Sequence, residues 1–456
     1  MDIKQIVESQ KEYYKTGITH NIEFRLAMLK KLLQEINNFE DEIMLALYQD
    51  LKKNKTESYI SEISLIKSEI KYMIKYLSRL AKPKKVPTPL IHFIAKSYIY
   101  SFPYGVVLII SPWNYPFLLT LVPLIDALAA GNTAILKPSD YSFNSALVIE
   151  KIIKKCFVSP YVTTILGGRE KNKELLDQKF DYIFFTGSKA VGHLVMQKAA
   201  NFLTPITLEL GGKSPCIVDS TAQIALAAKR IVFGKFLNCG QTCVAPDYLL
   251  VHEKIKDILL EKIIQEIENM YTKDPLNNPD YGGIINQKHF NRICNLIDKE
   301  KIYYGGTFDE STLKISPTIL INVSFNDAIM NEEIFGPLLP IITYSQDEEL
   351  TSLIEKNSHP LALYIFSKNK KLISFLINYL PFGGATVNDT VIHLASSHLG
   401  FGGIGSSGMG SYHGKKGYET FSHFKSVLYK SNLLDISLRY PPYTKNKQKI
   451  IKKITK

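Results

Sequence analysis

The sequence predicts an α/β protein built from two doubly wound parallel-sheet domains. The chain has 456 residues, which is long for a single hydrophobic core. Apolar residues make up 45% and charged residues 21%, a balance typical of a folded globular protein. From residue 105 onward, short apolar runs alternate with segments that can form helices. This alternation is typical of a parallel sheet covered by helices.

The predicted strands form two series along the chain. The first series comprises residues 106–110, 133–137, 162–166 and 182–186. The second comprises residues 214–218, 248–252 and 385–388, with a helix expected over 253–270. Residues 209–212 are expected to link the two domains. Because such sheets bind ligands at the carboxyl ends of their strands, residues 137–140 and 186–188 are candidate binding positions.

Two long helices are predicted before the first strand series. Residues 21–50 and 58–80 carry apolar side chains at spacings of three and four. The prolines of residues 82–89 end the second helix and predict an extended connection. Residues 90–102 then alternate as in a strand.

The formal net charge of +12 invites comparison with nucleic-acid-binding proteins. Half of it lies in residues 440–456, which contain six lysines and no acidic residue. Since no nucleic-acid-binding motif accompanies this charge, we expect no nucleic-acid partner. The segment is predicted to be a basic flexible tail. It fits either a solvated terminus or weak peripheral contact with an anionic membrane.

The remaining composition points to a cytoplasmic protein without a resident metal. The most apolar stretch, residues 117–130, is too short to cross a bilayer of about 30 Å, and the amino terminus resembles no export signal. The five cysteines form neither a disulfide framework nor a metal-binding pattern. A reducing compartment fits this cysteine usage.

Three polar residues in apolar or tightly turned surroundings are candidates for chemistry. Cys243 lies in a small, Gly-interrupted loop, and a thiolate there would be a nucleophile. Glu209 lies in an apolar run, where burial would raise its pKa toward that of a general base. Asn114 stands between two prolines and offers a fixed amide donor. Taken singly, each also fits a structural role as a buried thiol, a strand-end carboxylate or a turn residue.

Five motifs in order resemble the aldehyde dehydrogenase superfamily over nearly the whole chain. They are Pro-Trp-Asn-Tyr-Pro (112–116), Phe-Thr-Gly-Ser (185–188), Leu-Glu-Leu-Gly-Gly-Lys (208–213), Gly-Gln-Thr-Cys (240–243) and Glu-Glu-Ile-Phe-Gly-Pro (332–337). The runs 238–248 and 408–416 are most similar to the class 3 branch, which includes fatty and aromatic aldehyde dehydrogenases.

The resemblance implies a catalytic role for each of the three candidates. The Cys243 sulfur would attack the aldehyde to form a thiohemiacetal, and loss of hydride would leave a thioester. The Asn114 amide and the Cys243 backbone N–H would stabilise the oxyanion. Glu209 would activate the water that releases the carboxylic acid.

The resemblance also implies a dinucleotide, with NAD expected first and NADP left open. Gly187 ends a predicted strand before a helix, an arrangement that lets phosphate approach the backbone. Asp140 replaces the longer Glu that often bonds the ribose 2′-hydroxyl in this family. The cofactor-binding residues implied are Lys137, Asp140, Thr186, Gly187, Ser188, Gly192, Glu333 and Phe335.

Substrate contacts, partners and domain bounds follow from the same resemblance. Tyr115, Thr242, His393 and Phe401 match positions near the substrate tunnel and suggest an apolar aldehyde. A homodimer is expected, formed through a small β arm. The expected division is residues 1–81 and 103–210 for NAD(P) binding, 211–392 for catalysis, and 82–102 with 393–430 for oligomerisation and bridging.

Cys239 either replaces a small Ser or forms a protective disulfide with Cys243 under oxidation.

Two alternatives remain beside NAD(P)-dependent aldehyde oxidation. One is a relative that reduces an activated acid, and Glu209 argues against it because such enzymes often lack that base. The other is a structural protein on the same fold, against which the presence of Cys243, Glu209 and Asn114 argues.

Overall fold

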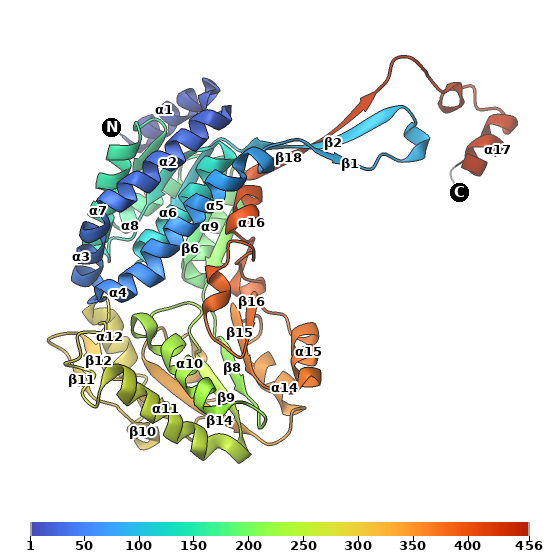
Figure 1. The fold of residues 1–456 in the computed structure, drawn as a ribbon. Helices are drawn as coiled ribbons and strands as arrows, with labels where there is room; N and C mark the ends of the chain where they lie inside the picture. The colour runs from blue at the N-terminus through green and yellow to red at the C-terminus, as the bar shows by residue number, and fades with distance from the viewer. Residues whose placement is uncertain (1, 455–456) are drawn as a thin grey trace.

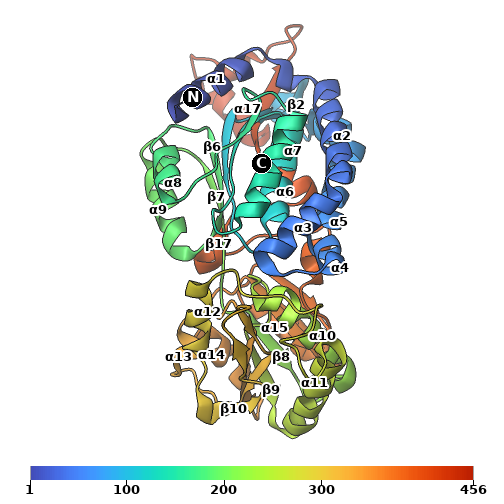
Figure 2. The same ribbon diagram turned by 90° about the vertical axis from the view of Figure 1, so that its left-hand side faces the viewer.

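The computed structural model describes residues 2–454 and contains two stacked α/β units and a projecting arm (Figure 1). Each unit has a mostly parallel sheet with helices on its faces, as the sequence predicted. The two units remain stacked in the view turned by 90° (Figure 2).

The first sheet has six strands in the order β17-β7-β6-β3-β4-β5. Its strands are β3 (Val106–Ile110), β4 (Thr133–Lys137), β5 (Val162–Thr164), β6 (Tyr182–Gly187), β7 (Ile206–Leu210) and β17 (Gly408–Met409). All neighbours are parallel except β17, which runs antiparallel to β7. The fully buried β3 and β4 need helices on both faces, and the chain supplies α1 (Ile3–Lys15), α6 (Pro116–Ala130), α7 (Phe143–Cys156), α8 (Arg169–Leu176) and α9 (Lys189–Ala200).

The second sheet has seven strands in the order β10-β13-β14-β9-β8-β15-β16. These are β8 (Pro215–Val218), β9 (Tyr248–His252), β10 (Ile302–Tyr304), β13 (Thr318–Leu320), β14 (Leu338–Tyr344), β15 (Ala362–Phe366) and β16 (Gly384–Val387). Its helices are α10 (Ile224–Phe236), α11 (Lys256–Tyr271), α12 (Gln287–Cys294), α13 (Ala328–Asn331), α14 (Glu349–Glu355) and α15 (Lys370–Tyr379). A separate hairpin pairs β11 (Phe308–Asp309) with β12 (Lys314–Ile315).

The connection between the sheets begins later than residues 209–212, the range predicted from the sequence. Glu209 and Leu210 still belong to β7, where they pair with Thr186 and Gly187 of β6. Residues 211–214 make the actual connection to β8. Glu209 is therefore held by a strand rather than by a flexible linker.

The amino-terminal helices differ from the two continuous helices that were predicted. The first is broken at Phe39 into α2 (Ile22–Asn38) and α3 (Glu40–Leu51), because Phe39 leaves the helical conformation with φ −96° and ψ 8°. The second consists of α4 (Lys55–Ser58), a π-helical turn (Tyr59–Ile63) and α5 (Ser64–Leu80). Such π turns are frequent near functional sites.

A three-stranded sheet forms the arm that projects from the first unit (Figure 1). It contains β1 (Lys84–Val86), β2 (Ala95–Pro103) and β18 (Ser422–Lys430), which follows α16 (Gly414–Thr420). The strand predicted over 90–102 begins only at Ala95, since residues 90–92 form a short 3₁₀ turn. The segment predicted to be a tail contains the exposed helix α17 (Lys445–Ile454).

Among residues 2–454, no helix has the length and apolar composition that crossing a bilayer requires. Within the same residues, no three His, Cys, Asp or Glu side chains gather in an arrangement that could hold a metal ion.

Candidate active site

A cavity of about 650 Å³ lies between the two sheets and brings together most of the predicted site residues. Strand ends of the first sheet, loops of the second sheet and residues 401–412 all contribute to its wall. The predicted residues that line it are Asn114, Thr186, Gly187, Ser188, Glu209, Cys243, Glu333, Phe335 and Phe401. Residues far apart in the sequence therefore form one site.

The nucleophile candidate lies in a tightly wound loop that follows α10. Asn238, Cys239 and Gly240 adopt successive left-handed conformations with φ of 53°, 55° and 74°. Gly240 is required, because a Cβ there would lie 2.3 Å from the carbonyl oxygen of Gly336. The Asn238 side chain donates to the carbonyl oxygens of Asn114 (2.8 Å) and Gln241 (3.2 Å). These contacts fix the loop that carries Cys243.

The Cys243 thiol faces the cavity in surroundings that disfavour the thiolate. Burial, reinforced by the carboxyl groups of Glu333 and Glu209, raises the pKa of the thiol far above its usual range. Nucleophilic attack therefore requires a base or a positive charge that is brought to the cavity.

Glu209 presents a carboxyl group from the end of β7. The residue is 3% exposed, and neither carboxyl oxygen has a hydrogen-bond partner within the described chain. Burial raises the pKa of this carboxyl well above its usual value. A carboxyl group with a raised pKa suits a role in which a proton is accepted and returned.

Asn114 lies beside the cysteine loop at the start of α6. One N–H of its amide donates to the carbonyl oxygen of Gln241 at 3.0 Å. An amide nitrogen carries two hydrogens, so the second remains for a ligand in the cavity. The bond to Gln241 also fixes the side chain relative to Cys243, two residues later.

The turn from β6 into α9 offers an anion site to the cavity. Ser188 is the residue before the helix, and its side chain caps no backbone N–H group. The buried Thr186 hydroxyl has no hydrogen-bond partner in the described chain. Free helix amides and an unpaired hydroxyl fit the phosphates of a dinucleotide.

Glu333 and Phe335 lie on an irregular segment between α13 and β14. Burial, reinforced by the charge of Asp247, raises the pKa of Glu333 to about 8, and its Oε1 has no partner in the described chain. Gly211 leaves space for this carboxyl, because a Cβ there would lie 1.9 Å from Oε2. Phe335 has φ 48° and packs edge-on against Trp113 with ring centroids 5.4 Å apart.

Three predicted cofactor residues lie outside the cavity wall. Lys137 is buried at the end of β4, where its Nζ donates to the Pro138 carbonyl oxygen at 2.8 Å. Burial lowers its pKa. Asp140 lies against Gly168, where a Cβ would approach the carboxylate to 2.9 Å. Gly192, on α9, leaves space for a neighbouring leucine of β7.

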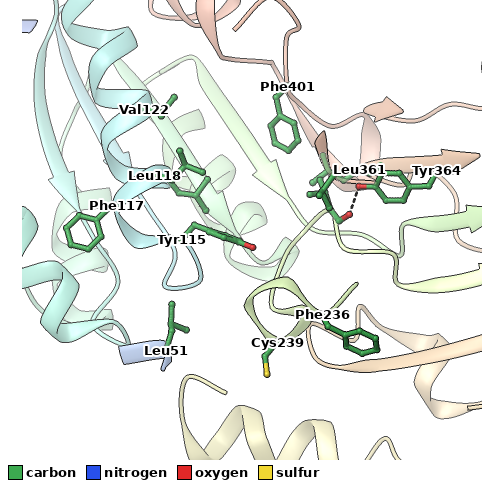
Figure 3. Close-up of a cluster of buried hydrophobic side chains, with 14 of the residues drawn as sticks. Leu51, Tyr115, Phe117, Leu118, Val122, Phe236, Cys239, Leu361, Tyr364 and Phe401 are labelled. Carbon is green, nitrogen blue, oxygen red and sulfur yellow. Dashed lines mark hydrogen bonds between the residues drawn. The ribbon is translucent and has the colours of Figure 1, made fainter. Parts of the chain in front are cut away.

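Three predicted substrate residues also lie behind the cavity wall. The hydroxyls of Tyr115 and Thr242 are hydrogen-bonded at 2.6 Å, and both residues are buried. His393 bonds the Thr386 hydroxyl through Nδ1 at 3.0 Å and packs behind Phe401, and burial lowers its pKa to about 4. Figure 3 shows Tyr115 and Phe401 within one cluster of buried hydrophobic side chains.

The Cys239 thiol points away from the Tyr115 side chain in Figure 3. Its Sγ donates to the carbonyl oxygen of Gly282 at 3.3 Å, and the residue is 1% exposed. Burial raises its pKa to about 12. This geometry favours the structural interpretation of Cys239 over a disulfide with Cys243.

Four buried or half-buried charged residues near the site were not predicted to have a role. Lys213 pairs with Asp247, Arg292 bonds the Glu333 segment, and the Nζ of Lys235 has no hydrogen-bond partner in the described chain. Lys213 belongs to a recognised motif, and Lys235 lies in an otherwise apolar helix face. Asp247 and Arg292 give no comparable sequence signal.

Comparison with known proteins identifies the fold and the family. The profile of the aldehyde dehydrogenase family matches residues 1–427. The chain belongs to this family. It is an NAD(P)-dependent aldehyde dehydrogenase, as the sequence motifs predicted.

Two curated relatives cover almost the entire enzyme. The 4,4′-diaponeurosporen-aldehyde dehydrogenase of Staphylococcus aureus is 48% identical over 452 residues, which are 99% of this chain and 98% of the relative. The dimeric NADP-preferring aldehyde dehydrogenase of the dog, Canis lupus familiaris, is 43% identical over 442 residues, covering 96% and 98%.

Two solved structures show the same fold. The substrate-bound state of Staphylococcus aureus AldH is 48% identical, covers 100% of both chains and has a TM-score of 0.98. Betaine aldehyde dehydrogenase from Staphylococcus aureus in complex with NAD⁺ is 26% identical, covers 95% of this chain and 88% of its own, and has a TM-score of 0.85.

Proposed function

We propose that this aldehyde dehydrogenase oxidises an apolar aliphatic or aromatic aldehyde through a covalent intermediate on Cys243. The observation that carries the proposal is the shared cavity of Cys243, Asn114, Glu209 and Glu333. The cavity therefore offers the substrate a nucleophile, an oxyanion donor and a proton acceptor. It also offers a candidate contact for the ribose of the cofactor.

The covalent steps use groups that already face the cavity. The Cys243 thiol gives its proton to solvent as its sulfur bonds to the carbonyl carbon, and the second Asn114 N–H with the Cys243 backbone N–H stabilises the resulting oxyanion. When bound, the oxidised nicotinamide supplies a positive charge and accepts the hydride whose loss converts the thiohemiacetal to a thioester. Glu209 then accepts a proton from the water that attacks the thioester and returns it to the departing sulfur, which releases the acid and restores the thiol.

The cofactor assignment rests on polar groups without protein partners. The amides that follow Ser188 and the hydroxyl of Thr186 would bind phosphate, and Glu333 would bind the nicotinamide ribose, with Phe335 packing nearby. Lys137 and Asp140 would bind the adenosine ribose from β4. We assign NAD as the first cofactor, and NADP as the alternative that the shorter Asp140 leaves possible.

An apolar substrate fits the side chains around the catalytic groups. The aromatic and aliphatic residues of the cavity wall include Trp113, Leu119, Leu361, Phe401 and Tyr412. Such a wall favours a hydrocarbon chain or ring over a charged aldehyde. The Staphylococcus aureus relative is named as a 4,4′-diaponeurosporen-aldehyde dehydrogenase, which supports an aldehyde as the substrate.

The wider organisation is part of the same proposal. Residues 1–81 with 103–210 would form the NAD(P)-binding domain and residues 211–392 the catalytic domain. The arm of β1, β2 and β18 presents an exposed sheet for a homodimer, and a dimeric relative is known. We place the enzyme in the cytoplasm, with the lysines of α17 available for weak contact with an anionic membrane.

A panel of aliphatic and aromatic aldehydes assayed with NAD⁺ and with NADP⁺ tests the assignment. We expect the highest kcat/KM for uncharged aldehydes with long chains or rings, with NAD⁺ preferred. A higher kcat/KM for small charged aldehydes would contradict the proposed substrate class.

A further inference from the structure

The segment from Ala328 to Phe335 carries two predicted cofactor contacts but little regular structure. The four-residue helix α13 ends at Asn331, Glu332 is extended, and Phe335 is left-handed with φ 48°. A left-handed aromatic residue is uncommon and needs support from its surroundings. Three charged side chains from distant parts of the chain supply that support.

Lys213 contacts the segment from the connection between the two sheets. Its Nζ donates to the carbonyl oxygens of Ile329 and Glu332, each at 2.9 Å. The same Nζ pairs with Oδ2 of Asp247, and both side chains are 5% exposed. An ammonium group has three hydrogens, so all of them are used in this buried position.

Asp247 extends the contact from the other side. Its Oδ1 accepts a hydrogen bond from the backbone N–H of Ile334 at 3.0 Å. Its own backbone N–H donates to the carbonyl oxygen of Ser214 at 2.9 Å, which ties it to the end of the connection between the sheets. Asp247 also follows Cys243 by four residues. The Lys213–Asp247 pair therefore connects the cysteine loop to the segment that carries Glu333.

Arg292 supports the same backbone from α12. Its Nη1 pairs with the Glu332 carboxylate at 3.0 Å and donates to the Glu333 carbonyl oxygen at 3.4 Å. Its Nη2 donates to the Ile334 carbonyl oxygen at 2.5 Å. The guanidinium side chain is 27% exposed, so Arg292 completes the support from the partly solvated side.

We propose that the buried Lys213–Asp247 pair is a positioning device that fixes Glu333 relative to Cys243 and thereby sets the affinity for the nicotinamide half of the cofactor. The inference rests on the proposed contact between Glu333 and the ribose. Burying two charges is costly, and here both charges bond the backbone of one cavity-lining segment. Lys213 and Asp247 are positioning residues that need not touch the cofactor.

A second buried ion pair provides a matched control. Lys53 and Glu62 are paired at 2.8 Å and are 1% and 0% exposed. Glu62 bonds the backbone N–H groups of Phe117 and Leu118, at the start of α6. Removing Lys53 therefore removes a buried charge of the same kind without releasing the Glu333 segment.

The fluorescence of Trp113 gives a readout that does not depend on turnover. It is the only tryptophan of the chain, and Phe335 packs against it. Titration of the full-length protein with NAD⁺, without aldehyde, measures Kd through this signal. Melting temperatures measured on the same samples report the loss of stability separately.

We expect Lys213→Met to raise the Kd for NAD⁺ about tenfold and to change the emission of the free protein. Asp247→Asn keeps an oxygen for Ile334 but loses the charge, and Asp247→Leu loses both. The rise in Kd should therefore be larger for the leucine variant. Lys53→Met should lower the melting temperature and leave the Kd for NAD⁺ unchanged.

The Glu333→Gln variant separates failure of this inference from failure of the proposed function. If Glu333→Gln weakens NAD⁺ binding while Lys213→Met and both Asp247 variants bind as the wild type does, the positioning role is wrong. If Glu333→Gln binds NAD⁺ normally, the proposed ribose contact is wrong and the inference falls with it. Should Lys213→Met not fold, the two Asp247 variants still give the graded comparison, and equal Kd values for them would overturn the proposal.

Discussion

The two sheets deliver their functional groups to the cavity in different ways. The first sheet presents Glu209 from β7 and residues 186–188 from the end of β6, where the backbone is held by neighbouring strands. The second sheet presents Cys243 and Glu333 from irregular loops with left-handed residues. Those loops are held by side chains such as Asn238, and by buried charges. Groups on strands need no such supports, whereas groups on loops depend on them.

The largest effect is expected at the cysteine loop itself. Cys243→Ala should lower kcat by at least about 10⁴-fold, because no other group supplies the sulfur that forms the acyl intermediate. Cys239→Ala is the matched control, since this thiol bonds Gly282 and does not line the cavity. Steady-state NADH formation measures both variants. Activity near the wild-type level in Cys243→Ala would show that another residue is the nucleophile.

Replacing Glu209, which lies on strand β7, should affect a later kinetic step than replacing Cys243. Glu209→Gln removes the proton acceptor but leaves β7 intact, so a first burst of NADH is expected before turnover slows by about 10²- to 10⁴-fold. Stopped-flow absorbance distinguishes the burst from the steady state. Loss of the burst together with turnover would assign Glu209 to an earlier step.

Asn114 belongs to the first unit, where it precedes α6, but its amide is held by a hydrogen bond to the cysteine loop of the second unit. Asn114→Ala should raise the barrier to thiohemiacetal formation by about 2.7 to 4 kcal/mol, the usual cost of an oxyanion donor. The burst rate should fall by the corresponding factor while the Kd for NAD⁺ stays constant. An unchanged burst rate would remove Asn114 from the oxyanion site.

A pair of glycines with the same backbone conformation tests the support of the loop. Gly240 has φ 74° and lies against the Gly336 backbone, whereas Gly17 has φ 76° and no neighbour within 4 Å. Gly17→Ala should cost about 1 to 2 kcal/mol of stability from strain alone. Gly240→Ala should cost about 3 kcal/mol or more and should also reduce kcat. Thermal unfolding and kcat measured together check the comparison, and equal losses for the two variants would contradict it.

The smallest effect concerns the pH dependence of stability. The folded pKa of Glu333 is raised to about 8, so the folded protein binds its proton more tightly than the unfolded chain does. This contribution to stability is complete below the unfolded pKa and is lost as the pH rises toward about 8. The melting temperature of Glu333→Gln should therefore fall less steeply between pH 5 and 8 than that of the wild type. The same dependence on pH in both proteins would contradict this prediction.

Much of the first sheet could be predicted because its strands are short apolar runs bounded by turns. The strand expected over 162–166 ended two residues early, and the others matched closely. In the second sheet β10, β13, β14 and β15 were not predicted, although residues 338–344 of β14 are almost all apolar. Pro340 lies within that run, and proline argues against a central strand.

The residues proposed to act on the substrate could be selected from the sequence, but the contacts that support them could not. Cys243, Glu209 and Asn114 occur in motifs with a chemical signature. Lys213 and Asp247 are separated by 34 positions and meet only after both sheets have formed. The break at Phe39 also had no proline or glycine to mark it.

The central claim, an acyl intermediate on Cys243, can be tested by trapping it. The Glu209→Gln variant is mixed with NAD⁺ and a long-chain aldehyde, quenched in acid and digested, and the peptide that contains both Cys239 and Cys243 is sequenced by mass spectrometry. We predict an acyl group of the substrate's mass on Cys243 and none on Cys239. An acyl group on another residue, or acid production with no adduct on any cysteine, would contradict the account.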